Sequence, residues 1–239
     1  MPAQHTVIVG GSSGIGLATA QRLVAKGFTV TITGRDEARL DAAARKLGPE
    51  ARALRMDGTD TDALPARFSQ IGAFDHLVIA LGSGKGVGPF AELAIGDVKA
   101  GFEEKVYAHF AVAQSALPFL SPTGSVTFIS AISAQAAVPG TSGISAANAA
   151  IAALVPVLAV ELRPRRVNGV APGVIDTPWW DAIPTEQKLA LFNDFTAKTP
   201  VGRVGTSDDV ADAIAFLIGN DFITGHVLPI DGGLRFLAA

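Results

Sequence analysis

The fold of this chain is decided by the stretch Val7-Ile-Val-Gly10-Gly11-Ser-Ser-Gly14-Ile-Gly16. A short apolar run, typical of a buried β-strand, leads through glycines into a helical pattern. Gly10 permits a tight turn, Gly14 lets a phosphate approach the backbone, and Gly16 allows the helix to pack closely on the strand. The start of the helix would offer free N–H groups and the positive end of its dipole to a pyrophosphate.

A purely structural turn can also contain such glycines, but here they lie between a strand and a helix that open a β–α series. The stretch therefore predicts a nucleotide-binding site. The residues expected to contact the phosphates are Gly10, Ser12, Ser13, Gly14, Ile15 and Gly16.

Short runs rich in β-branched residues alternate with longer helical patterns along the chain. The expected strands are Thr6–Val9, Phe28–Thr33, Ala53–Met56, Asp75–Ala80, Ser125–Ser130, Val167–Val170 and His226–Ile230. The expected helices are Gly14–Lys26, Glu37–Leu47, Asp60–Gln70, Ile95–Leu120, Gly143–Arg163 and Ser207–Gly219. Strands that are apolar on both faces are typical of a parallel sheet with helices on both sides. We therefore expect an α/β fold: one Rossmann-type domain over residues 1–239, with a doubly wound parallel sheet of about seven strands.

Two segments interrupt this alternation. Gly82–Pro89 follows the fourth strand and is so rich in glycine that we expect a mobile loop. Thr177–Pro200 begins Thr-Pro-Trp-Trp and carries a helical pattern around Glu186–Phe195. Both follow the carboxyl end of a strand, where open α/β sheets bind ligands. Trp179 and Trp180 are expected either to form part of a lid over a ligand or to pack this helix onto the body.

The composition excludes several functional classes. The 22 acidic and 19 basic residues give a formal net charge of −3, which argues against nucleic acid or an anionic membrane as the main partner. Cysteine is absent, so disulfides, thiol catalysis and cysteine-bound metal are excluded, and we expect no metal site. We see no signal peptide, and no apolar run that reaches the roughly 18 residues of a membrane span. We expect a cytoplasmic protein in which the apolar stretch Ala146–Val160 is a buried core or interface helix.

The end of the second strand indicates which dinucleotide is bound. An acidic residue at position 34 would accept hydrogen bonds from a ribose 2′-hydroxyl, but the sequence has Gly34 followed by Arg35. Glycine leaves room for a 2′-phosphate and arginine offers it a charge, so we expect NADP, with NAD possible. The alternative is a solvated Arg35 that pairs with Asp36 or Glu37. Asp57-Gly58, after the third strand, is placed to bind the adenine amine, although an aspartate there can equally cap a helix.

Several further motifs resemble those of the short-chain dehydrogenase/reductase family along almost the whole chain. They are Gly10-x3-Gly14-Ile15-Gly16, Val167-Asn168-Gly-Val-Ala-Pro172-Gly173, Pro200-Val-Gly-Arg203-Val-Gly-Thr-Ser-Asp-Asp209-Val and Ile223-Thr-Gly-His-Val-Leu-Pro-Ile-Asp231-Gly232-Gly233. The resemblance implies a nicotinamide dinucleotide and an oligomer, usually a tetramer, built partly from the helices Ile95–Leu120 and Gly143–Arg163. It also implies cofactor contacts from Gly82, Pro172, Gly173, Ile175 and Thr177.

The family's catalytic residues do not carry over in this alignment. The family uses serine and tyrosine to hold and protonate the substrate oxygen, a lysine to lower the pKa of the tyrosine, and an asparagine in the proton relay. Those positions, in that order, read Ala131, Ile144, Asn148 and Lys105. Alanine and isoleucine cannot donate a proton, so we do not expect tyrosine-assisted reduction. Tyr107, the only tyrosine, lies two positions from Lys105 and should point elsewhere, toward a helix–helix interface.

The replacement of asparagine by Lys105 and of lysine by Asn148 is a reciprocal exchange. If both side chains reach one cavity, the site keeps one ammonium and one amide, and Lys105 would bind the ribose or protonate a substrate while Asn148 orients it. His109, one turn beyond Lys105, would extend a proton relay. The alternative is coincidence, with Lys105 paired with Glu104 or Asp97 at the surface.

Two functions remain open at this point. The first is an NADP-dependent oxidoreductase with a rearranged, non-tyrosine active site that acts on a carbonyl, alcohol or related small molecule. The second is an inactive nucleotide-binding protein that regulates a partner. They differ in whether the pocket near Lys105 and Asn148 is open and polar or filled by Ile144 and its neighbours.

Overall fold

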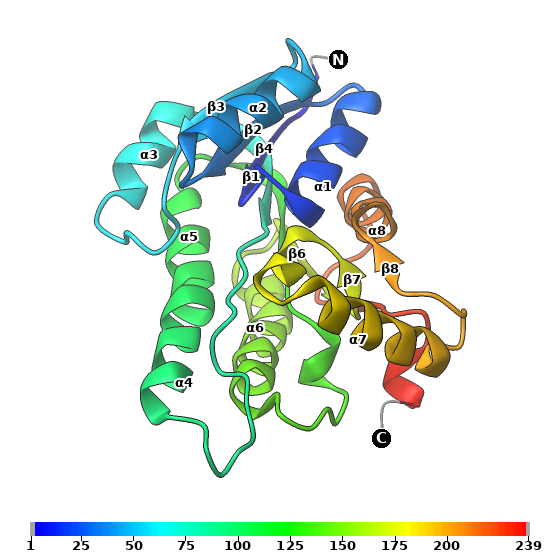
Figure 1. Ribbon diagram of the computed structural model, residues 1–239. Coiled ribbons are helices and arrows are strands. Elements are labelled where there is room, and N and C mark those ends of the chain that lie inside the picture. Colours follow the sequence, from blue (N-terminus) through cyan, green and yellow to red (C-terminus); the bar gives the residue numbers. More distant parts are fainter. Residues whose placement is uncertain (1–2, 238–239) are drawn as a thin grey trace.

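A parallel sheet of seven strands runs through the centre of the computed structural model, which describes residues 3–237 (Figure 1). Its strands are β1 (His5–Val9), β2 (Thr29–Gly34), β3 (Ala51–Arg55), β4 (Phe74–Ile79), β5 (Leu120–Ile129), β6 (Arg166–Pro172) and β9 (Val227–Ile230). The spatial order is β3-β2-β1-β4-β5-β6-β9, and every neighbouring pair is parallel. The expected doubly wound α/β sheet is confirmed.

Helices cover both faces of this sheet. They are α1 (Gly14–Ala25), α2 (Glu37–Leu47) and α8 (Ser207–Gly219) on one face, and α3 (Leu64–Ile71), α4 (Ile95–Phe102), α5 (Ala108–Ala116) and α6 (Ser142–Glu161) on the other. Successive residues of β1 point to opposite faces: Ile8 packs with Leu23 of α1, whereas Val7 packs in the cluster that contains Ile151 of α6. Because both faces are buried, the strands are continuous apolar runs.

The order in which the chain adds strands creates a crevice at one edge of the sheet. After β1 the chain builds β2 and β3 on one side, then returns to place β4 on the other side of β1. The loops that follow β1 and β4 therefore diverge at the carboxyl ends of these strands. Such a reversal of strand order is where open α/β sheets bind their ligands.

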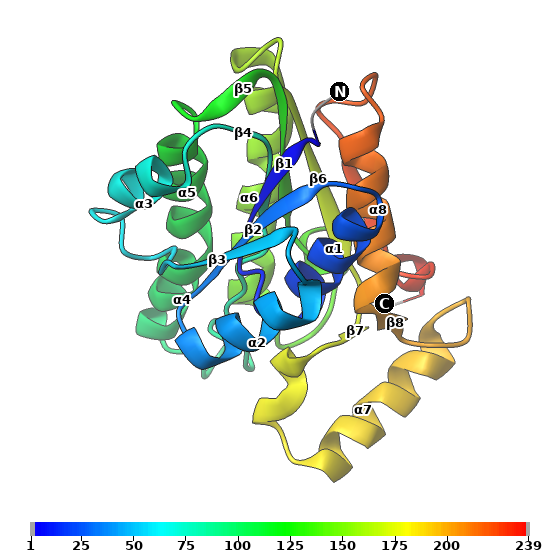
Figure 2. The same cartoon turned by 90° about the horizontal axis from the view of Figure 1, so that it is seen from above.

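A smaller unit lies beside that edge. The short strands β7 (Ile175–Asp176) and β8 (Gly205–Thr206) pair in parallel, and between them run the 3-10 turn η3 (Pro178–Ala182) and α7 (Thr185–Lys198). No residue of α7 is buried, and Figure 2 shows this helix projecting from the body. Trp180 ties it down, because its ring packs edge-on against Phe192 at 5.5 Å and its Nε1–H donates to the carbonyl of Ile175 at 2.9 Å. We call residues 177–200 the lid segment.

The helix expected over residues 95–120 is continuous from Ile95 to Ala116, so only its end was placed wrongly. After α4 the chain makes a π-helical turn, η1 (Glu103–Tyr107), before α5, and β5 begins already at Leu120. A π-turn keeps the chain helical, so a helical sequence pattern does not distinguish it from a regular α-helix. Two shorter 3-10 turns, η2 (Ile132–Ala134) and η4 (Leu234–Phe236), follow β5 and β9.

The expectation of a mobile loop at residues 82–89 is also wrong, because this glycine loop is docked on the start of α6. The amide of Ile144 donates to the carbonyl of Gly86 at 3.0 Å, and the amide of Gly88 donates to the carbonyl of Gly140 at 2.8 Å. The amide of Gly86 also donates to Asp97 at 2.7 Å. A Cβ on Gly143 would lie 2.8 Å from the Gly86 carbonyl oxygen. Glycine at these two positions therefore lets the backbone of the loop pack closely against the backbone of α6.

Helix α6 differs from the expectation that no apolar segment is long enough to span a membrane. Its 20 residues, Ser142–Glu161, are long and apolar enough by composition to cross a membrane, which we did not expect of any segment. In the structure it packs on β5 and β6 and buries Ile151 and Val155. Its opposite face leaves Val157 and Val160 exposed. This distribution is typical of a helix that packs on a sheet and has an apolar outer face.

Candidate functional site

A cavity of about 220 Å³ lies in the crevice between β1 and β4. The loops after β1, β2, β3 and β4 all contribute to its wall, and residue 104 of η1 closes one side. Its lining residues are Gly10, Ser12, Ser13, Gly34, Arg35, Asp36, Arg39, Met56, Asp57, Gly58, Thr59, Ala80, Leu81, Gly82 and Glu104. Seven of the expected cofactor residues are among them: Gly10, Ser12, Ser13, Arg35, Asp57, Gly58 and Gly82.

The glycines of the first loop adopt the geometry that a phosphate cradle needs. Gly10 has φ +87° and Gly14 has φ +50°, a region of backbone space that side chains disfavour. A Cβ on Gly10 would lie 2.6 Å from the carbonyl oxygen of Ala80, and one on Gly16 would collide with the carbonyl of Gly10. Any side chain there would fill the cradle, so this loop fits a bound pyrophosphate.

The end of β2 borders the cavity with Gly34 and carries the positive charge of Arg35. No carboxylate pairs with Arg35 within residues 3–237, because Asp36 instead pairs with Arg39 at 3.0 Å. A Cβ on Gly34 would lie 3.0 Å from the Ser12 hydroxyl, so a side chain at this position would crowd Ser12. Arg39 also lines the cavity, so the wall carries two guanidinium groups. The sequence pointed only to Arg35, since Arg39 reads as a solvent-facing helical residue.

Asp57 keeps one carboxylate oxygen available. Its Oδ1 accepts hydrogen bonds from the amide and the hydroxyl of Thr59, at 3.0 Å and 2.8 Å. No hydrogen bond within the described residues uses its Oδ2. Asp57 therefore stabilises its own loop and can still accept a ligand amine.

The remaining expected cofactor residues lie near the first loop or behind it. A Cβ on Gly14 would lie 3.6 Å from the Thr177 side chain, so the phosphate loop faces the start of the lid segment, with Ile15 in the first turn of α1. Pro172 and Gly173 end β6, and the Gly173 amide donates to the carbonyl of Ile230. Ile175 points its side chain into the apolar cluster with α8. Only its backbone is left for a cofactor contact.

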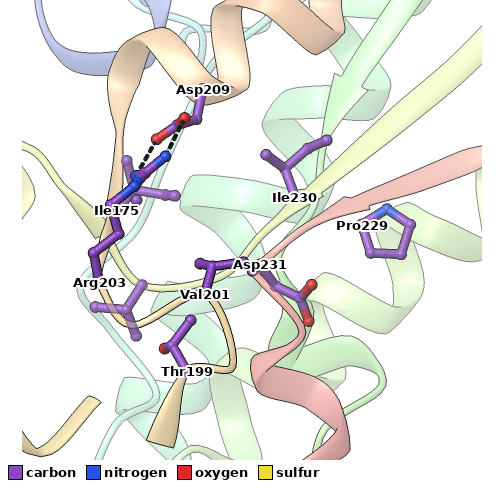
Figure 3. Close-up of a pocket in the computed structure, with 11 residues that line it drawn as sticks. Ile175, Thr199, Val201, Arg203, Asp209, Pro229, Ile230 and Asp231 are labelled. Atoms are coloured by element: carbon purple, nitrogen blue, oxygen red, sulfur yellow. Dashed lines mark hydrogen bonds and ion pairs between the residues drawn. The ribbon is translucent and has the colours of Figure 1, made fainter. Parts of the chain in front are cut away.

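Ile175 also borders a second cavity, of about 290 Å³, between the lid segment and β9 (Figure 3). Its charged groups are already paired. Arg203 holds Asp209 through two hydrogen bonds of 2.7 Å and 2.8 Å, which keeps the pKa of Asp209 well below its usual range. Asp231 binds Arg235 at 2.9 Å. This cavity is larger, but within residues 3–237 its charged side chains are paired with one another or with Arg235, so the crevice between β1 and β4 is the better candidate site.

Lys105 is buried in the π-turn, with 5 % of its surface exposed. Burial lowers the pKa of its ammonium to about 8. Its Nζ takes part in no hydrogen bond or ion pair within residues 3–237. The surface pairing considered above does not occur, because Glu104 binds the hydroxyl of Ser83 and Asp97 binds the amide of Gly86 and the ammonium of Lys85.

His109 stabilises the π-turn through a hydrogen bond from its ring to the backbone of Lys105. Its Nδ1–H donates to the carbonyl of Lys105 at 2.7 Å, and its ring stacks on Phe128 of β5 at 6.2 Å. Complete burial, together with the nearby Lys105 charge, lowers the pKa of His109 to about 3, so the ring is neutral and holds its proton on Nδ1. This arrangement fixes the backbone that carries Lys105, and it leaves no Nδ1 proton for the relay that we expected of His109.

Asn148 lies across from η1, on the helix that packs against it. Its Nδ2–H donates to the hydroxyl of Ser133 at 3.0 Å, and its backbone carbonyl accepts from the hydroxyl of Ser130 at 2.8 Å. Its Oδ1 is buried without a partner within residues 3–237. Lys105 and Asn148 do not hydrogen-bond to each other directly. A buried lysine side chain whose Nζ makes no hydrogen bond within residues 3–237 and a buried carbonyl oxygen without a partner therefore lie on two packed elements, where a ligand or a water molecule would satisfy them.

Comparison with known proteins agrees with this geometry. The family model described as enoyl-(acyl carrier protein) reductase matches residues 9–235. The chain belongs to the short-chain dehydrogenase/reductase family.

Individual members of the family match over nearly the whole chain. Cis-4-hydroxycyclohexanecarboxylate dehydrogenase of Sinomonas cyclohexanicum is 33% identical over 95% of this chain and 94% of its own length. The 3-oxoacyl-[acyl-carrier-protein] reductase MabA of Mycobacterium tuberculosis is 31% identical over 97% of this chain and 93% of its own. A crystal structure of a small-chain dehydrogenase in complex with NADPH superposes with a TM-score of 0.86, at 31% identity, over 98% of this chain and 99% of that one.

In this short-chain dehydrogenase/reductase, the two positions aligned with the family's tyrosine and serine carry apolar side chains, Ile144 and Ala131. Ile144 occupies the first turn of α6, under Gly86 of the glycine loop, and Ala131 precedes η2. Tyr107 is 60 % exposed on the outer side of η1, so it lies away from Lys105, as its spacing predicted. Sequence reasoning missed Ser83, which is 5 % exposed, and the Glu104 that binds it, because a polar residue among glycines is usually solvated.

Proposed function

We propose that this chain is an NADP(H)-dependent oxidoreductase in which Lys105, rather than a tyrosine, holds the proton that is exchanged with the substrate oxygen. The observation that carries the proposal is the buried Lys105 ammonium, which has no partner within residues 3–237. Isolated buried charges are costly, so an unpaired lysine kept inside a protein has a functional explanation more often than a structural one.

The crevice fits the cofactor. Gly10, Gly14 and Gly16 leave the pyrophosphate cradle free of side chains, and Arg35 with Arg39 offers two guanidinium groups to the 2′-phosphate. NADPH bound in a structural neighbour that is 31% identical supports the same dinucleotide here. When bound, the cofactor supplies or accepts the hydride.

The protein side of the reaction is then divided between two residues. Lys105 has a pKa of about 8, so at neutral pH its Nζ is protonated and can release a proton to an oxygen that becomes negative during reduction. Asn148 is held by Ser133 and keeps its Oδ1 without a partner among the described residues, so this oxygen would accept a hydrogen bond from a substrate or ribose hydroxyl. In the reverse direction, neutral Lys105 would accept the proton of an alcohol.

The names of the relatives define the first substrates to examine. They act on a hydroxy derivative of a cyclohexane carboxylate and on a 3-oxoacyl thioester, in both cases as a dehydrogenase or a reductase. For this chain we therefore propose a secondary alcohol or its ketone. An inactive regulatory protein on the same fold is not favoured, because these relatives are enzymes.

The proposal is tested by NADPH oxidation against cyclic ketones, 3-oxoacyl thioesters and enones, with NADPH binding measured first by calorimetry. We expect at least one ketone to be reduced by the wild-type protein and none by Lys105→Met, which should still bind NADPH. Turnover by Lys105→Met at the wild-type rate would overturn the role of Lys105. NADPH binding without turnover on any of these substrates would favour the non-catalytic function.

A further inference from the structure

A short chain of contacts joins the cofactor crevice to the lid segment through Ser83. The hydroxyl of Ser83 donates to Oε2 of Glu104 at 2.8 Å, and Glu104 lines the crevice. The carbonyl of the same residue accepts the Nε1–H of Trp179 at 3.2 Å. Residues 83, 104 and 179 are far apart in the sequence, so only the fold brings them together.

Ser83 is held more firmly than a residue in a glycine-rich loop would be by default. Its hydroxyl also accepts the amide of Lys85 at 3.0 Å, and only 5 % of its surface is exposed. The loop beyond it is docked on α6 through Gly86 and Gly88. The position of the Ser83 carbonyl is therefore set by Glu104 on one side and by α6 on the other.

The lid segment is also attached to the body by Lys188, which pairs with Asp176 at 2.9 Å, and by Thr199, which lies against Gly232. Among the described residues, only the Trp179–Ser83 hydrogen bond joins it to the glycine loop. Helix α7 buries no residue, and Trp180 and Phe192 pack within the segment itself. Trp179 is partly exposed and lies edge-on to Trp180 at 4.7 Å. The Trp179–Ser83 hydrogen bond therefore joins a projecting segment to the glycine loop.

We propose that Ser83 is a positioning residue, held by Glu104, that latches Trp179 and thereby keeps the lid segment over the bound cofactor. This inference rests on the proposed function only in assuming that the crevice binds NADP(H). The role differs from catalysis, since neither Ser83 nor Trp179 touches a reacting atom in the proposal. Loss of the latch should shorten the residence of the cofactor rather than abolish its binding.

The test measures NADPH dissociation in stopped flow, by chasing the bound NADPH with excess NADP⁺ and following its fluorescence. A hydrogen bond of ordinary net strength corresponds to about a fivefold change in rate. We expect Trp179→Phe and Glu104→Met each to accelerate dissociation by about fivefold. Since both break one chain of contacts, the double variant should be no faster than about fivefold to tenfold. Glu104→Gln removes the charge but keeps an acceptor for the Ser83 hydroxyl. Because Glu104 also lines the crevice, Glu104→Gln is the reference for Glu104→Met, and the latch predicts faster dissociation from Glu104→Met than from Glu104→Gln.

A second readout needs no cofactor. Trp179 and Trp180 are the only tryptophans in the chain, and both lie in the lid segment. Acrylamide should quench the emission of Glu104→Met more strongly than that of the wild type or of Glu104→Gln. Unchanged quenching, or a double variant whose acceleration is the product of the two single effects, would overturn the latch.

A wild-type protein that binds no NADPH would refute the proposed function and the coupling together, whereas tight binding with unchanged dissociation would refute the coupling alone.

Discussion

Replacing Lys105 with methionine should stabilise the cofactor-free protein at neutral pH. The side chain is 5 % exposed and no carboxylate pairs with it within residues 3–237. Burial lowers its pKa from 10.5 in the unfolded chain to about 8 in the folded one. At 1.36 kcal/mol per pKa unit, the charged lysine costs the folded state about 3 kcal/mol. Methionine has a similar length and no charge, so this cost disappears without leaving a cavity.

The sign of the pH dependence follows from the same shift. Below pH 8 both states bind the proton, and the full cost of burying it is present. Between pH 8 and about 10.5 the folded state has lost the proton and the unfolded state still holds it, so the wild type gains stability as the pH rises. The advantage of Lys105→Met should therefore fall from about 3 kcal/mol at pH 7 to about 1 kcal/mol at pH 10.

Urea unfolding followed by circular dichroism at pH 7 and pH 10, at one protein concentration, measures this difference. Lys99→Met is the matched control, because Lys99 is exposed and has no ion pair among the described residues. The control should show no comparable gain. A Lys105→Met variant that is less stable than the wild type at pH 7, or a difference that is independent of pH, would refute the assignment of Lys105 as an unpaired buried cation.

Three further predictions concern the cofactor, the assembly and the family residues. Arg35→Ala should weaken NADPH binding by about tenfold, the contribution of a charge-assisted hydrogen bond, and leave NADH binding unchanged in calorimetry; equal losses for both would remove the 2′-phosphate contact. The exposed side chains of Tyr107 on η1, Phe110 on α5, and Val157 and Val160 on α6 mark the surface where we predict an interface between copies. Val160→Glu should therefore lower the mass measured by light scattering, and a monomeric wild type would contradict this interface. Ile144→Tyr combined with Asn148→Lys should not create family-type activity in the NADPH assay, because Ala131 remains and Lys105 adds a second buried cation; a large gain in rate would mean that the usual site is intact.

The sequence predicted the sheet and the crevice well, because both depend on local patterns. Apolar runs such as that of β1 occur only where a strand is buried on both faces, and the glycines at 10, 14 and 16 fit only a tight strand–helix turn. Lys105 and Asn148, which were located by the family resemblance, lie on two elements that pack together, and their sharing one cavity stays a prediction. Tyr107 pointed away, as a separation of two residues requires.

What the sequence did not predict depends on contacts between distant segments. The carbonyl of Lys105 in the π-turn accepts the ring Nδ1–H of His109 in addition to the backbone amide of Ala108, and no apolar periodicity records this contact. The glycine loop is ordered because Gly86 meets Gly143 of α6, a contact between residues far apart in the chain. Ser83 is buried for the same reason. Residues that act through such contacts look like ordinary loop residues in the sequence.

The pH dependence of NADPH oxidation with a ketone substrate tests the central claim, that Lys105 holds the transferred proton. The wild-type rate should be constant below about pH 7 and should fall by about tenfold per pH unit above the Lys105 pKa of about 8. Lys105→Met should be inactive at every pH, and Lys105→Arg should be equally inactive, since arginine keeps the charge but does not release its proton. A Lys105→Arg enzyme with the wild-type rate, or a wild-type profile that is flat from pH 6 to pH 10, would contradict the claim.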